Sequence, residues 1–353
     1  MCLYPKLIPN PKYRTSKKRG YYKPSPHDAR LNYVPVACGK CYECRKKKAR
    51  EWRIRLAEEI RHNKSYFVTL TIDDENLEML KNELEVKTVK GNENNIATLA
   101  LRKFLERCRE KTGKSLKHWC VTELGEDRGR IHLHGIFFGN NAAELVIEKW
   151  KYGYVFIGNF VNEKTINYIS KYMLKDDLNN REFTGKVLTS AGMGKQYFER
   201  GDWKFNQYDG ENTREYYVFK NGTRAMMPRY YRDKIYSEEE RELLWLQKLD
   251  KGDTWVMGEK CKIDSDEYKN LLSYYREQAK QIHGDNIVLW KEKQYWRRLE
   301  KQRSMYRKRR NMNEYIDRQT AERINNYEIG NSINTTGRMR RIVTGKQIGR
   351  AHV

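Results

Sequence analysis

Apolar and polar positions along the chain follow two periods, and each period predicts one kind of element. Residues 65–74, "SYFVTLTIDD", are rich in β-branched and aromatic side chains and end in acidic residues, which is typical of a buried strand. Residues 117–124 and 131–138 predict two further strands, joined by the short polar segment "GEDRGR". Residues 97–113 repeat apolar side chains at helical spacing and end at a glycine, which predicts an amphipathic helix.

Other segments extend this alternation of helices and strands. A helix is expected after Cys44, where Trp52, Leu56 and Ile60 recur every four residues, whereas the polar residues 81–95 predict a loop. The remaining expected elements are a helix over 142–150, a strand over 153–160, a helix over 163–177 and a hairpin with a type I′ turn at Asn221–Gly222. The pattern predicts an α+β fold: a central antiparallel sheet with the 131–138 strand in its middle and helices packed on one face.

Composition changes along the chain and suggests four segments. They are an extended arm with a cysteine cluster (1–45), the α+β domain (46–236), a charged and mostly helical C-terminal region (237–346) and a terminal peptide (347–353). The terminal peptide "QIGRAHV" resembles translated sequencing-adapter DNA, so we leave it out of the interpretation. Within the C-terminal region, residues 291–310 are very basic, which fits either a solvated helical face or a nucleic-acid grip.

The charge of the chain narrows the class of partner. Lys and Arg number 71 against 47 Asp and Glu, a formal net charge of +24, which favours a polyanion: nucleic acid first, an anionic membrane surface second. The 25 tyrosines and 8 tryptophans either fill the core or stack on unpaired bases. Because no apolar run reaches about 18 residues, no membrane span is expected.

Cysteine usage bears on the compartment. The beginning of the chain, "MCLYPKLIPNPKYRTSKKRG", lacks an apolar stretch, so no export signal is expected. Seven cysteines, an odd number, then indicate reduced thiols in a cytosol, with metal binding as the exception.

Two histidines one residue apart raise the question of a metal site. Side chains alternate along a strand, so His132 and His134 lie on the same face of the 131–138 strand. Alone, they could be ordinary strand residues. However, Glu123 ends the preceding strand, and a tight hairpin would bring its carboxylate beside them. Two imidazoles and one carboxylate, with coordination positions left open, indicate a catalytic rather than a structural metal site.

A pair of tyrosines lies further along, in "YISKYMLK". Tyr168 and Tyr172 are four residues apart and share one face of the expected helix, and Lys171 and Lys175 each follow a tyrosine by three residues. An amphipathic helix with aromatic core contacts is the simpler interpretation. A phenol can also attack a phosphodiester, but its pKa near 10 makes it a weak nucleophile. It then needs a divalent cation and a nearby ammonium group, which this sequence offers.

Three cysteines at regular spacing form a second candidate metal site. Cys38, Cys41 and Cys44 can take three corners of a zinc tetrahedron, with Cys2 as the favoured fourth ligand and a histidine as the alternative. An iron–sulfur cluster lacks a clear fourth ligand, and unligated thiols remain the simpler alternative.

Taken together, these motifs resemble a known set. "FVTLTID", "HLH" with upstream Glu123, and "YISKYMLK" resemble the three motifs of the HUH endonuclease superfamily, in the paired-tyrosine form of rolling-circle replication initiators. "CGKCYECRKKKAREW", "GMGKQYF" and "MPRYYRDKIY" are similar to segments of the replication initiation proteins of microviruses, in the gokushovirus branch. The resemblance extends from about residue 36 to residue 240.

The resemblance implies a ferredoxin-like HUH fold and a specific reaction. The protein would nick one strand of phage replicative-form DNA at the origin, remain joined to the 5′ phosphate through tyrosine, and later religate the product into a circle. It further implies Mg²⁺ or Mn²⁺ at Glu123, His132 and His134, although these residue types would equally suit zinc. DNA and the host replication machinery are the implied partners, in the host bacterial cytoplasm and without a membrane.

Three alternatives explain less of the sequence. A non-enzymatic single-stranded DNA-binding or packaging protein would use the charge and the aromatic rings but leave the histidine and tyrosine motifs unexplained. An oxygenase with two histidines and one carboxylate does not need the basic charge. A plasmid-type relaxase is the nearest enzymatic rival.

Overall fold

The fold was analysed in a computed structural model of the chain. The residues that it describes are 2–15, 17, 20–125, 129–158, 161–174 and 183–283. The described residues up to Ile282 belong to one compact unit. Lys175, the basic segment 291–310 and the terminal peptide 347–353 lie outside the described residues.

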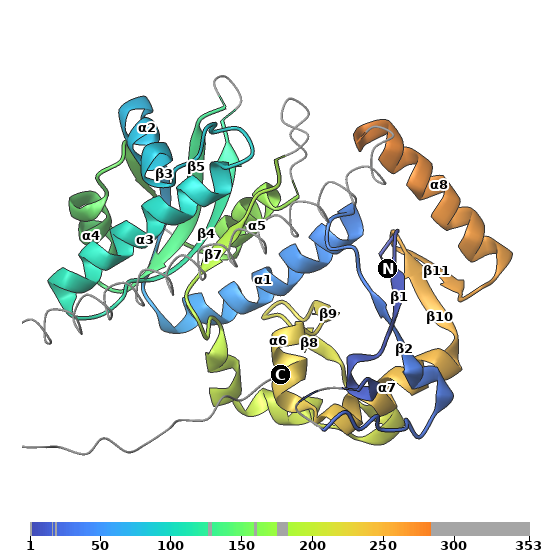
Figure 1. The fold of residues 1–353 in the computed structure, drawn as a ribbon. Coiled ribbons are helices and arrows are strands. Elements are labelled where there is room, and N and C mark those ends of the chain that lie inside the picture. Colours follow the sequence, from blue (N-terminus) through green and yellow to red (C-terminus); the bar gives the residue numbers. More distant parts are fainter. Residues whose placement is uncertain are drawn as a thin grey trace, which may run out of the picture. The chain divides into compact units, whose positions relative to one another are not determined.

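A five-stranded antiparallel sheet forms the centre of the α+β part (Figure 1). Its strands, in spatial order, are β6 (Val155–Gly158), β3 (Ser65–Thr71), β5 (Ile131–Phe138), β4 (Lys117–Leu124) and β7 (Val187–Thr189). The strand with His132 and His134, β5, occupies the middle, and the predicted bounds of β4 and β5 are confirmed.

Helices cover both faces of this sheet. On one face, side chains of β3, β4 and β5 pack against three helices: α2 (Asp74–Glu83), α3 (Glu93–Thr112) and α4 (Ala142–Lys149). On the other face, the same strands pack against α1 (Tyr42–His62) and α5 (Glu163–Tyr172).

The prediction of helices on one face only was therefore wrong. In β5, Leu133 and Phe137 point into the first core, whereas Ile136 and Phe138 point into the second. Because both sets are apolar, each face has to be covered by helices to keep these side chains out of water.

Helix α2 was not expected from the sequence. The acidic residues that close β3 predicted a turn, but the Asp73 carboxylate accepts a hydrogen bond from the N–H of Asn76 at 2.8 Å and caps α2. The predicted loop over 81–95 accordingly contains the end of α2 and the start of α3. An acidic residue after a strand can end one element or begin the next, and the local pattern does not distinguish the two.

The predicted hairpin at Asn221–Gly222 exists, as β8 (Tyr216–Val218) and β9 (Arg224–Met226), but with a different turn. Phe219 and Thr223 pair across a three-residue loop in which Gly222 has a φ of 79° while Asn221 does not have a positive φ. A type I′ turn needs positive φ at both central residues, so the expected turn type was wrong.

Two further ribbons and several helices complete the described chain. The N-terminal ribbon pairs β1 (Lys6–Pro9) with β2 (Tyr33–Val36). After Ser237 the chain forms α7 (Glu238–Lys251), the hairpin of β10 (Asp253–Val256) with β11 (Glu259–Lys262), and α8 (Asp266–His283). Helix α6 (Arg229–Ile235) precedes them, and the 3₁₀ helices are Pro11–Tyr13, Ala29–Asn32, Lys195–Glu199, Gly201–Asn206 and Gly210–Asn212. The β10–β11 hairpin was not expected in a region predicted to be mostly helical.

Two buried carboxylates fix α1 to its surroundings. Glu59 accepts hydrogen bonds from Lys117 of β4 at 2.5 Å and from the N–H of Gly194 at 2.8 Å, and Glu58 pairs with Arg200 at 2.6 Å. Both acidic side chains are fully buried, and a buried charge is tolerated only when it is paired. Helix α1 is therefore held in register with the sheet that it covers.

None of the helices in the described part of the chain is both long and apolar enough to cross a membrane.

Candidate active site

The register of the central strands brings three candidate ligands together. Glu123 of β4 lies directly opposite His132 of β5, and both, like His134, point to the face covered by α1 and α5. One ligand atom from each of the three side chains lies within 4.8 Å of the others. The hairpin thus places the carboxylate beside the histidines, where the sequence pattern had placed it.

The ring of His134 is held from both sides. Its Nε2 lies 2.7 Å from a carboxylate oxygen of Glu123, and its Nδ1 lies 3.0 Å from the hydroxyl of Thr69 on β3. His134 is buried, so these partners fix the orientation of the ring. Thr69 was missed by the sequence analysis, although alternation along β3, and pairing with His134 across the sheet, put it on the same face.

Helix α5 carries the tyrosine pair to this site. The helix begins with a capping box in which Asn162 and Thr165 exchange hydrogen bonds, and it buries Ile166 and Ile169 against the sheet. Tyr168 and Tyr172 face the histidines, because side chains four residues apart share one side of a helix.

The contact between Tyr172 and His134 is close. The two rings are stacked, with centroids 4.1 Å apart and planes inclined by 1°. The Tyr172 hydroxyl donates a hydrogen bond to the Tyr168 hydroxyl at 2.6 Å, and Tyr168 is 49% exposed. Both hydroxyls therefore lie together beside the Glu123–His134 pair.

The electrostatics of Tyr172 show what its hydroxyl requires. Burial raises the pKa of Tyr172 above its ordinary value, and the hydrogen bond with Tyr168 and the charge of Glu123 raise it further. In this geometry the phenol keeps its proton at neutral pH, so an attack through its oxygen requires a nearby cation.

These side chains line an open pocket of about 690 Å³. Its walls are formed by Glu123, Gly125, His132, His134, Tyr168, Lys171, Tyr172 and Leu174. Lys171 is exposed and contributes the cation of the first Tyr-x-x-Lys unit. Gly125 leaves room for His132, since a Cβ there would lie 3.0 Å from the Cε1 atom of that ring.

The end of the tyrosine helix is anchored by α1. The guanidinium of Arg45 donates a hydrogen bond to the carbonyl of Leu174 at 3.1 Å, two residues after Tyr172. No pattern in the sequence pointed to Arg45, because the contact joins segments that are 129 residues apart.

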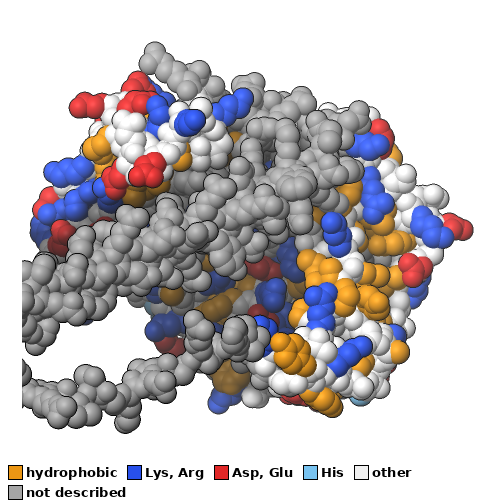
Figure 2. Space-filling view, in the orientation of Figure 1, with side chains coloured by type: hydrophobic (Ala, Val, Ile, Leu, Met, Phe, Trp, Pro, Cys, Tyr) orange, Lys and Arg blue, Asp and Glu red, His pale blue; other side chains and the backbone are white. Residues whose placement is uncertain are grey.

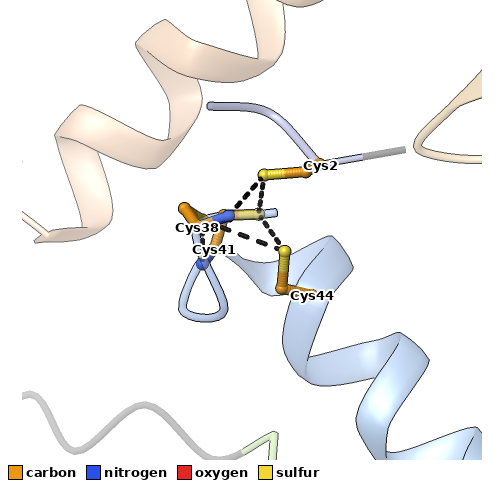
Figure 3. A group of neighbouring side chains, drawn as sticks. All are labelled: Cys2, Cys38, Cys41 and Cys44. Carbon is orange, nitrogen blue, oxygen red and sulfur yellow. Dashed lines mark hydrogen bonds between the residues drawn. The ribbon is translucent and has the colours of Figure 1, made fainter. Parts of the chain in front are cut away.

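The four predicted cysteines form a second group, shown in Figure 3. The Sγ atoms of Cys41 and Cys44 are 3.5 Å apart, and those of Cys38 and Cys44, like those of Cys41 and Cys2, are 3.9 Å apart. These distances are far longer than a disulfide bond of about 2.05 Å. Four thiols therefore face one common point.

Backbone groups and a small core hold this cysteine group. The N–H groups of Tyr4 and Cys38 donate to the Cys2 sulfur at 3.3 and 3.2 Å, and that of Cys41 donates to the Cys38 sulfur at 3.3 Å. Side chains from β10, β11 and α8 pack beside the group, including Val256 and Leu272. The cysteines thus join the N-terminal residues to the first turn of α1.

Comparisons with known proteins agree with the motifs. Residues 65–177 match a family described as replication-associated protein ORF2, a segment that runs from β3 past the end of α5. The chain is 24% identical over 246 residues to the replication-associated protein ORF4 of Chlamydia phage 1, which covers 60% of this chain and 57% of that protein. It is 23% identical over 266 residues to the replication-associated protein VP4 of Bdellovibrio phage phiMH2K, covering 67% and 79%, respectively.

These matches confirm the resemblance to microvirus replication proteins that the motifs indicated. The chain spans little more than half the length of the Chlamydia phage protein. No solved structure matches the chain.

Proposed function

We propose that this relative of the microvirus replication-associated proteins initiates rolling-circle replication by nicking one DNA strand at the origin, with an HUH-type fold and a tyrosine nucleophile. The observation that carries the proposal is the stacking of Tyr172 on His134, with the Tyr168 hydroxyl 2.6 Å from that of Tyr172. A paired tyrosine in contact with a Glu/His/His group, in an open pocket, combines a nucleophile with a site for a cation.

The residues present fit a divalent cation. Glu123, His132 and His134 offer one oxygen and two nitrogen donors close together, and Thr69 at Nδ1 leaves Nε2 of His134 to serve as the ligand. These three residues would hold Mg²⁺ or Mn²⁺, and zinc is compatible with the same donors. When bound, the cation would polarise the scissile phosphate and offset the charge that develops on it.

The chain's own groups account for the remaining chemistry. A tyrosine oxygen attacks the phosphorus, a Tyr–O–P bond forms, and the bond from phosphorus to the 3′ oxygen breaks. The phenol loses its proton and the 3′ oxygen gains one, so the products are a 5′ phosphotyrosine and a free 3′ hydroxyl. The ammonium of Lys171, in the wall of the same pocket, stabilises the phenolate or the leaving oxygen. Lys175 is proposed for the same role with the second tyrosine.

Two adjacent tyrosines allow the reaction to be repeated and reversed. After one round of synthesis, the second tyrosine attacks the regenerated origin, and the released 3′ hydroxyl attacks the first phosphotyrosine. This step restores a phosphodiester, frees the first tyrosine and closes a single-stranded circle. Because the hydroxyls of Tyr168 and Tyr172 lie 2.6 Å apart, one bound phosphate can be reached by either after a small shift.

The partners follow from this chemistry. Lys and Arg side chains are spread over the described surface that Figure 2 shows, in keeping with a net charge of +24 and with phosphate contacts. Origin DNA is the proposed substrate, and the free 3′ hydroxyl would prime a host polymerase, which places the reaction in the host bacterial cytoplasm.

For the cysteine group we propose a structural zinc ion. Zinc held tetrahedrally at about 2.3 Å from each thiolate requires sulfur–sulfur distances of about 3.8 Å. The observed distances of 3.5 to 3.9 Å are close to that value, and they leave room for one ion rather than for a multi-iron cluster. The three N–H groups that donate to sulfur would stabilise the thiolates.

Metal-dependent nicking of single-stranded origin DNA tests the proposal. The purified full chain should cut the oligonucleotide with Mg²⁺ or Mn²⁺ and lose this activity in EDTA, with recovery when either cation is restored. Zinc in the cysteine group should survive brief chelation, so the fold should persist throughout, as followed by circular dichroism. Equal cutting with and without EDTA, in a folded protein, would contradict the proposed metal site.

A further inference from the structure

A line of aromatic rings leads from the tyrosine pocket to the edge of the sheet. The ring of Tyr168 lies 6.1 Å from that of Phe67 on β3, with planes inclined by 80°. Phe67 in turn lies 6.3 Å from Phe156 on the edge strand β6, with planes inclined by 69°. The contacts are edge-to-face, so the line is continuous from α5 across β3 to β6.

Strand pairing places these rings on the face that carries the histidines. Phe156 is opposite Thr69, whose hydroxyl contacts His134 on that face. Phe67 is opposite Gly158, where a Cβ would lie 3.1 Å from the Phe67 ring. The glycine thus lets the Phe67 ring lie over bare backbone between its two aromatic neighbours.

The outer rings are not needed to fill the core. Tyr168 is 49% exposed and Phe156 is 47% exposed, whereas Phe67 packs partly against the core beneath α1 and α5. Phe156 is not among the residues that pack into the hydrophobic clusters of the described chain. A large ring held half in water on an edge strand, within two ring contacts of a nucleophile, is well placed to contact a ligand.

Cations flank the same line. Lys164, Tyr168 and Lys171 are spaced by four and three residues on α5, so they share one face of the helix. Both lysines are exposed. A row of alternating cation and ring suits a chain with phosphates along its backbone and flat apolar bases, which is the chemistry of single-stranded nucleic acid.

We propose that Phe156, supported by Phe67, is a base-stacking platform for the unpaired DNA next to the scissile phosphate, with Lys164 and Lys171 contacting its phosphates. The inference rests on the proposed nicking function and identifies the path of the bound strand. Its occupant is single-stranded, because the bases of a duplex are stacked on each other and cannot offer a face to Phe156.

The test separates stacking from charge by changing both the protein and the ligand. Fluorescence anisotropy would measure the binding of a labelled oligothymidine of about twelve nucleotides, and of an abasic oligonucleotide of equal length, to the full chain in EDTA. Phe156→Leu keeps an apolar side chain but removes the ring, and Phe156→Tyr keeps the ring. Phe205→Leu is the matched control, since Phe205 is a 67% exposed ring in another element, the 3₁₀ helix Gly201–Asn206.

Phe156→Leu should weaken oligothymidine binding roughly tenfold and leave abasic binding unchanged, because only the bases contact the ring. Phe156→Tyr and Phe205→Leu should bind both ligands like the unchanged protein. Lys164→Ala should weaken both ligands equally and reduce the salt dependence of binding.

Two results would overturn the proposal: equal oligothymidine affinity in Phe156→Leu, or an equal loss for the abasic ligand, which would indicate a general structural effect. Because binding is measured without divalent cation, it is independent of cleavage. A chain that never nicks but shows the base-specific Phe156 effect would disprove the nickase and retain the platform as a single-stranded DNA site.

Discussion

The two candidate metal groups of this protein differ in the ways that separate catalytic from structural sites. Glu123, His132 and His134 offer three oxygen and nitrogen donors in the wall of an open pocket, with a tyrosine stacked on one of them. The cysteine group offers four sulfurs around one point, which fills a tetrahedron and leaves no position for a substrate. The number and kind of donors therefore assign chemistry to the first group and stability to the second.

The two groups also differ in how the fold builds them. The first depends on strand register, since neighbouring positions of β4 and β5 set the spacing of its donors. The second joins Cys2 near the chain start to the first turn of α1, and it is surrounded by a small core from β10, β11 and α8. Losing a ligand should consequently affect activity at the first group and folding at the second.

The largest effect is expected from His132→Ala. Removing one of three ligands should lower nicking by roughly a thousandfold or more, because the cation supplies several kcal/mol of transition-state stabilisation. DNA affinity should remain close to that of the unchanged protein, since phosphate contacts come from Lys and Arg. His62→Ala, at an exposed position at the end of α1, is the control and should nick normally. Normal nicking by His132→Ala would remove the metal assignment.

A different outcome is expected from Cys41→Ser. The variant should lose its zinc, measured by mass spectrometry of the purified protein, and be less stable by about 4 kcal/mol, which corresponds to roughly 10 °C in thermal unfolding. Cys108→Ala is the matched control: this thiol is buried among α3 and the sheet, so zinc content should stay at one ion per chain. Finding neither zinc nor iron in the unchanged protein would disprove the structural site and leave the nickase proposal intact.

The smallest effect tests whether the two groups are connected. Arg45 follows Cys44 and donates to the Leu174 carbonyl at the end of the tyrosine helix. Arg45→Gln should lower kcat by roughly tenfold or less, with KM, zinc content and DNA affinity retained, because one charged hydrogen bond that positions the tyrosines is lost. Lys46→Gln removes an exposed charge at the next position of α1 and should be neutral. Equal losses in both variants would indicate a charge effect instead of positioning.

Much of the candidate site follows from local sequence rules. Alternation along a strand puts His132 and His134 on one face, and the short connection after Glu123 brings its carboxylate opposite them. Helical spacing likewise puts Tyr168 and Tyr172 on one side of α5. These rules act over a few residues, where steric and hydrogen-bonding constraints leave little freedom.

What the sequence analysis missed depends on tertiary contacts. Thr69 and Arg45 reach the site from strands and helices far along the chain, and no local period indicates such a contact. The second helical layer was missed because an apolar strand shows that it is buried without showing how many faces are covered. Helix α2 was missed because Asp73 acts as a helix cap rather than as a strand end.

Covalent trapping of DNA tests the central claim most directly. An origin oligonucleotide labelled differently at its two ends is incubated with Mn²⁺ and analysed on a denaturing gel. The unchanged protein should carry the 3′-end label on a protein band, while the 5′-end label moves to a shorter fragment with an extendable 3′ hydroxyl. Tyr168→Phe or Tyr172→Phe alone should retain some adduct but fail to complete religation, since only one strand can be held. The double variant should bind the oligonucleotide yet form no adduct, whereas a persistent adduct in the double variant would assign the nucleophile to another residue.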